Sequence, residues 1–95
     1  KAPKYGIWGM TKNKNPDEFI KQFKNIFTKI IAIPISNEKD SLDNCFLKKI
    51  ANENNIKCET ADNFYAALKK ISDDKKKIIC VFGSLYLCGE VLNKN

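Results

Sequence analysis

The sequence contains no histidine and no arginine, so all 17 of its basic residues are lysines. Without histidine, the Ser-His and Cys-His pairs of nucleophilic catalysis cannot form within this chain. Without arginine, the bidentate contacts that nucleic-acid readers make to guanine and phosphate are missing. The sequence also lacks a G-x-x-x-x-G-K-[ST] phosphate loop, a signal-peptide pattern and any apolar run near the ~20 residues of a membrane span. We therefore expect neither histidine-dependent catalysis nor a membrane protein.

The composition suits one soluble domain over residues 1–95, with 43% hydrophobic and 29% charged residues. The formal net charge is +6. We attribute most of this charge to a codon bias that favours lysine and to lysines on solvated helix faces. We attribute a smaller part to the binding of anionic ligands. The charge leaves open an alternative function, a small lysine-rich nucleic-acid or ribosome-binding module.

The four cysteines match neither a zinc pattern nor a C-x-x-C redox pair, and no metal site is expected. Cys80 and Cys88 stand at apolar positions, which is typical of small buried hydrophobic residues. Reduced thiols in a cytoplasmic protein are therefore the expected state.

Short apolar runs, which are typical of buried strands, alternate along the whole chain with helical stripes, in which apolar residues recur every three or four positions. Strands are expected at residues 5–10, 29–35, 56–60 and 77–82. Helical stripes are expected at residues 19–30, 42–51, 64–71 and 85–92, and the phenylalanines on these stripes, including Phe46 and Phe64, should lie in the core. Asn15 should cap the first helix, with Glu18 reaching back in a capping box. The pattern predicts a small Rossmann-like, three-layer α/β domain, with a mostly parallel sheet of about four strands and helices on both faces.

In an open parallel sheet, ligands bind beyond the carboxyl ends of the strands. One candidate there is the Gly83–Ser84 corner, where glycine permits close approach and Ser84 could donate to a carboxylate or phosphate. The local pattern by itself favours the simpler interpretation, in which Ser84 caps its own helix. The other candidate is the loop that carries Lys12 and Lys14. Its simpler interpretation is an ordinary solvated loop in a lysine-rich chain.

Three segments resemble motifs of one family in the family's own order. Residues 9–16 (GMTKNKNP) followed by Phe19 resemble the motif that begins the carboxyl-terminal domain of folylpolyglutamate synthases and dihydrofolate synthases, members of the Mur ligase superfamily. Residues 33–35 (IPI) resemble the strand exit that follows, and residues 83–92 (GSLYLCGEVL) resemble the closing signature. The resemblance implies a carboxyl-terminal, glutamate-ligase type domain that is a fragment of a larger enzyme.

The resemblance also implies a function. The full enzyme would be a cytoplasmic, monomeric ligase that joins L-glutamate to a folate or pteroate through an acyl phosphate. ATP and Mg²⁺ would be bound by upstream domains, so no catalytic residue and no activity are expected in this domain alone. Lys14, Gly83 and Ser84 match motif positions implied to bind glutamate. Asn15 stands where the family usually has aspartate, which puts in doubt a role of that carboxylate in orienting Lys14 or contacting the central domain.

Overall fold

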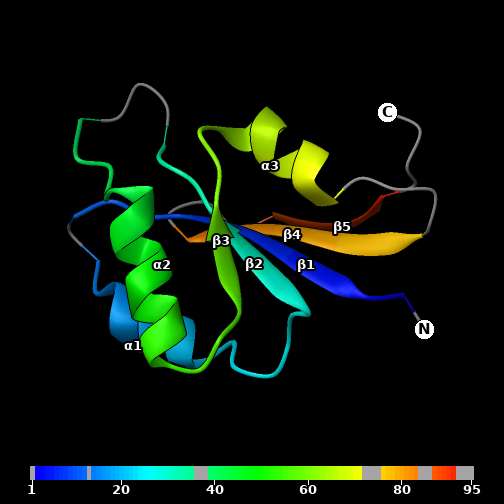
Figure 1. Ribbon diagram of the computed structural model, residues 1–95, viewed down its shortest axis with the longest axis horizontal. Coiled ribbons are helices and arrows are strands. Elements are labelled where there is room, and N and C mark those ends of the chain that lie inside the picture. Colours follow the sequence, from blue (N-terminus) through cyan, green and yellow to red (C-terminus); the bar gives the residue numbers. More distant parts are fainter. Residues whose placement is uncertain (1, 13, 36–38, 72–75, 84–86, 92–95) are drawn as a thin grey trace.

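The computed structural model describes residues 2–12, 14–35, 39–71, 76–83 and 87–91. Within these ranges strands and helices alternate up to the last two elements, which are both strands (Figure 1). In chain order the elements are β1 (Lys4–Gly9), α1 (Pro16–Lys21), β2 (Lys29–Ala32), α2 (Asn44–Glu53), β3 (Cys58–Thr60), α3 (Phe64–Ile71), β4 (Lys77–Gly83) and β5 (Leu87–Val91).

The strands form one sheet in the order β3-β2-β1-β4-β5. The four strands from β3 to β4 run parallel to one another, as predicted. Strand β5 runs antiparallel to β4, so the helix predicted at residues 85–92 is wrong for Leu87–Val91. Gly89 disfavours a helix interior by about 0.5–1 kcal/mol relative to alanine, and the free edge of β4 offers this segment a ladder from Lys77 to Val81. Residues 85, 86 and 92 lie outside the described part.

Helices cover both faces of the sheet, which confirms the three-layer α/β class. Helices α1 and α2 lie side by side over one face, and α3 lies over the other (Figure 1). Successive side chains of a strand point to opposite faces. In β1, Trp8 therefore joins the core under α1 and α2, whereas Ile7 joins the core under α3. Both side chains are fully buried, as expected for a parallel strand at the centre of a covered sheet.

An aromatic cluster lies between β4 and the stretch of chain formed by α1 and the turns that follow it. Phe82 is 1% exposed, and its ring centroid lies 4.9 Å from that of Phe23, 5.2 Å from Phe27 and 5.8 Å from Phe19. On its other side Phe82 stacks on Trp8 at 6.4 Å. These separations fall near the range in which aromatic pairs attract beyond simple burial. The cluster therefore ties the first helix to the middle of the sheet.

Helix α1 is shorter than its apolar stripe predicts. The stripe continues to Ile30, but the helix ends at Lys21 and Ile30 belongs to β2. Beyond Lys21 the backbone forms tighter turns, in which an N–H bonds to the carbonyl three residues earlier, as Phe23 does to Ile20 at 3.0 Å. Asn25 then adopts a left-handed conformation, with a φ of 68°. An asparagine tolerates this conformation and ends the helical path. The stripe was thus correct about which face is buried and wrong about the helix length.

Two phenylalanines predicted in the core lie partly at the surface. Phe46 is 46% exposed and Phe64 is 38% exposed. Both lie in the first turn of a helix, α2 and α3 respectively, at the edge of the sheet where the parallel strands end. At that edge no further layer of the described chain covers them.

The cysteines differ in state. Cys45 and Cys58 carry free thiols, and burial raises the pKa of the Cys58 thiol to about 12. Cys80 is buried, as predicted, but it is disulfide-bonded, so the expectation of a reduced thiol is wrong there. Cys88 is the Cα partner of Cys80 in the ladder between β4 and β5, a placement that the predicted helix would not have produced.

Candidate functional site

The parallel strands end at one edge of the sheet, which we call the carboxyl rim. The chain order reverses between β1 and β4, because β1 has β2 on one side and β4 on the other. Such a switch point separates the two outgoing loops and opens a crevice between them. The loop after β1 and the end of β4 therefore mark the place where a ligand of this fold would bind.

The loop after β1 is tied to the loop that precedes α2. The Lys12 N–H donates to the Asp40 carbonyl at 2.8 Å, and the Leu42 N–H donates to the Met10 carbonyl at 2.8 Å. These two bonds hold the start of the loop in a short antiparallel contact. Lys14, two residues beyond Lys12, therefore follows an anchored segment.

A cavity of about 240 Å³ opens at this point of the carboxyl rim. We call it the rim cavity. Its lining residues are Met10, Lys14, Asn15, Glu18, Phe19 and Gln22. Phe19, which is partly exposed, contributes an apolar wall, and Met10 is fully buried. The remaining lining side chains are polar or charged. Lys14 and Asn15, both selected from the sequence, thus share one cavity.

Sequence reasoning missed Glu18 and Gln22 as members of this site. A signal that groups these two with each other was present, because residues four apart, such as Glu18 and Gln22, lie on the same face of a helix. Lys14 precedes the N-cap Asn15, so helical spacing does not connect it with them. The capping interpretation of Glu18 hid its position on the cavity side.

Asn15 caps α1, as predicted. Its Oδ1 accepts hydrogen bonds from the backbone N–H groups of Asp17 at 3.1 Å and Glu18 at 3.2 Å. The capping box is only half formed, because among the described residues the Glu18 carboxylate makes no return bond to Asn15. With Oδ1 used by the cap, the Nδ2 amide of Asn15 remains to donate beside the rim cavity. An aspartate, which the sequence resemblance leads one to expect here, could cap equally well but would offer no such donor.

Lys14 and Glu18 bring opposite charges to the rim cavity. Both side chains are exposed. Within the described ranges neither of them forms an ion pair, whereas Asp17 and Lys21 on the same helix do so at 3.2 Å. The Asn54 amide and Lys21 hold the pKa of the Asp17 carboxyl below its usual value. The neighbouring charges on α1 are thus neutralised, while those of the cavity are available to a ligand.

The end of β4 lies beside the end of β1. Gly83 pairs with Gly9 across the ladder and has a φ of +121°. A Cβ atom at Gly83 would lie 1.9 Å from the Gly9 carbonyl oxygen and 3.2 Å from Cγ of Met10. Only glycine permits this approach. Lys14 and Gly83 therefore both belong to the carboxyl rim, and Ser84, the third predicted contact, lies outside the described residues.

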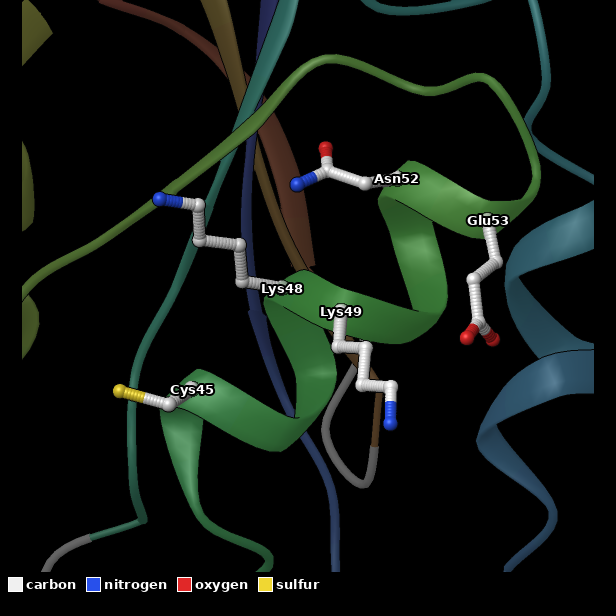
Figure 2. Close-up of a pocket in the computed structure, with 5 residues that line it drawn as sticks. All are labelled: Cys45, Lys48, Lys49, Asn52 and Glu53. Atoms are coloured by element: carbon white, nitrogen blue, oxygen red, sulfur yellow. The ribbon is translucent and has the colours of Figure 1, made fainter.

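A second and larger hollow, of about 430 Å³, lies along the outer face of α2. Figure 2 shows that its side chains do not converge: Cys45 and Lys48 point to one side of the helix, and Lys49 and Glu53 to the other. Because all of its lining residues come from this one helix, nothing encloses a ligand. The rim cavity is the better candidate.

In the described ranges, no group of three or more histidine, cysteine, aspartate or glutamate side chains could hold a metal ion. In the same ranges no helix has the length and apolar character needed to cross a membrane.

Together, the mostly parallel sheet and its two helical layers define a Rossmann-like domain, and the charged rim cavity beside the loop after β1 is its candidate ligand site. A family model described as "Dihydrofolate synthetase, C-terminal domain" matches residues 7–94. The chain belongs to this family, a family of ligases, and the resemblance found in the sequence is confirmed. A carboxyl-terminal domain of such a synthase implies an upstream domain in the same chain. No match was found among curated proteins or among solved structures.

Proposed function

We propose that this domain serves an ATP-dependent ligase that joins L-glutamate to dihydropteroate or to a folate. The observation that carries the proposal is the family match over residues 7–94, combined with Lys14 in a cavity beside the loop after β1. The nucleic-acid alternative has only the net charge of +6 in its support.

The reaction has two steps. The carboxylate of the pteroate or folate attacks the terminal phosphoryl group of ATP, so that ADP leaves and an acyl phosphate forms. The amine of glutamate then attacks the acyl carbon, phosphate leaves, and the nitrogen gives up a proton to yield the amide. Because this chain has no phosphate loop and its described residues offer no metal site, we assign ATP and Mg²⁺ to the upstream domain.

The role of this domain is to hold glutamate against that upstream domain. The Lys14 ammonium pairs with a glutamate carboxylate, and such a charge-assisted contact contributes about 1.5–3 kcal/mol. Gly83 allows the backbone at the end of β4 to approach the substrate, and Ser84 adds a hydroxyl donor. Asn15 contributes a contact to the substrate or to the upstream domain. Closure of the two domains brings the amine to the acyl phosphate, and precise juxtaposition supplies much of the rate acceleration.

The test uses the full-length synthase. Lys14→Gln should raise the KM for glutamate by roughly tenfold or more and leave the KM for ATP nearly unchanged, because a contact of about 1.5–3 kcal/mol is lost on one substrate only. Ser84→Ala should act in the same direction. Lys24→Gln, at an exposed lysine outside the rim cavity, is the matched control. An equal effect of Lys14→Gln on glutamate and ATP would contradict the assignment, as would glutamate ligation by the 95-residue chain alone.

A further inference from the structure

The rim cavity presents a separated pair of opposite charges, Lys14 and Glu18. Within α1, Asp17 and Lys21 pair across one helical turn at 3.2 Å. Lys14 precedes Asn15, the N-cap of α1, and so lies outside the helix, whereas Glu18 lies in its first turn. In the part of the chain that the structure describes, Lys14 and Glu18 remain apart although they line one cavity. A ligand that carries both a positive and a negative group could therefore contact each of them without breaking an existing pair.

The other walls of the cavity suit such a ligand. The Nδ2 amide of Asn15 is left over from capping and can donate to a carboxylate next to Lys14. The partly exposed ring of Phe19 offers apolar contact for methylene groups. The volume of about 240 Å³ lies below the roughly 300–1,000 Å³ of pockets that enclose drug-sized ligands. This size suits one amino acid.

We propose that the rim cavity recognises the incoming substrate as a zwitterion: Glu18 accepts its ammonium group, and Lys14 with Asn15 Nδ2 holds a carboxylate. The inference rests on the proposed function and assigns a polarity to that site. Glu18 thereby selects amino acids over simple dicarboxylates and directs the nitrogen that will attack. The ammonium group must lose a proton before its nitrogen can attack. Among the residues that line the rim cavity, Glu18 carries the carboxylate that can accept this proton.

The experiment compares two ligands of the full-length synthase that differ only in the amino group: L-glutamate as substrate and glutarate as competitive inhibitor. Glu18→Gln should raise the KM for glutamate roughly tenfold or more and leave the Ki of glutarate unchanged or lower, because glutarate has no ammonium to lose a partner. Lys14→Gln should weaken both ligands. Glu53→Gln, at an exposed glutamate on α2 outside the rim cavity, should affect neither.

The outcomes separate this inference from the proposed function. If Glu18→Gln weakens glutamate and glutarate equally, its effect is on the shape of the cavity and the inference is overturned. If Glu18→Gln has no effect while Lys14→Gln weakens both ligands, the ammonium contact is wrong and the proposed function stands. If neither variant changes either ligand, the rim cavity is not the glutamate site and both proposals fail. Thermal unfolding of each variant shows whether the fold is intact.

Discussion

Replacing Phe82 by alanine would remove the ring at the centre of the aromatic cluster between β4 and α1. Phe82 is 1% exposed, and four ring centroids lie within 6.4 Å of its own. Burial of a phenylalanine contributes about 1.5–3 kcal/mol, and the cavity left behind adds to the loss. Phe→Ala changes in well-packed cores typically cost about 3–5 kcal/mol.

A loss of this size is large for a chain of 95 residues. Small domains have a free energy of unfolding of about 5–15 kcal/mol, and short chains bury proportionally less surface than long ones. With a urea dependence of about 1–3 kcal/mol per molar, the midpoint of Phe82→Ala should fall by at least about 1 M. Phe82→Leu keeps most of the side-chain volume and should therefore lower the free energy of unfolding clearly less than Phe82→Ala does.

Phe46→Ala is the matched control, since the same atoms are deleted from a ring that is 46% exposed. Its expected cost is about 1 kcal/mol, roughly half of a full burial. Urea unfolding followed by circular dichroism measures all three variants. Equal losses for Phe82→Ala and Phe46→Ala, or a loss below about 1 kcal/mol at Phe82, would refute the role of this cluster. The rim cavity would be affected as well, because its wall residue Phe19 stacks on Phe82 at 5.8 Å.

Two further predictions follow from single positions. Gly83→Ala should destabilise the domain by at least about 2–3 kcal/mol in thermal unfolding, because the new Cβ would meet the Gly9 carbonyl at 1.9 Å in a backbone conformation that only glycine adopts readily. Gly9→Ala, whose Cβ would lie 3.0 Å from its nearest side-chain neighbour, should cost less, and the reverse order would contradict the close approach of β1 and β4. At pH 8 a thiol reagent should modify the exposed Cys45 far faster than Cys58, whose pKa of about 12 keeps it protonated. Peptide mapping measures the extent of modification at each cysteine. Equal modification rates of Cys45 and Cys58 in the folded protein would be inconsistent with burial of Cys58.

Only part of the candidate site could be predicted from the sequence. Lys14 and Asn15 could be selected because a loop at the end of an apolar strand faces the ligand edge of a parallel sheet. Their grouping with Met10, Phe19 and Glu18 depends on how α1 packs, and a one-dimensional pattern does not contain that packing. The exposure of Phe46 and Phe64 has the same origin. Their spacing places them on an apolar stripe, but the stripe extends past the end of the sheet that it covers.

Local chemistry by itself determined the succession of strands and helices through β4, the Asn15 cap and the parallel α/β class, because each depends on neighbours a few residues away. Tertiary structure decided where α1 stops, which phenylalanines reach solvent and what Leu87–Val91 becomes. That last segment has the apolar spacing of a helix, yet it pairs with β4, because an open strand edge satisfies its backbone hydrogen bonds and Gly89 weakens the alternative. A free edge exists only after the sheet has formed, so no local pattern could have shown it.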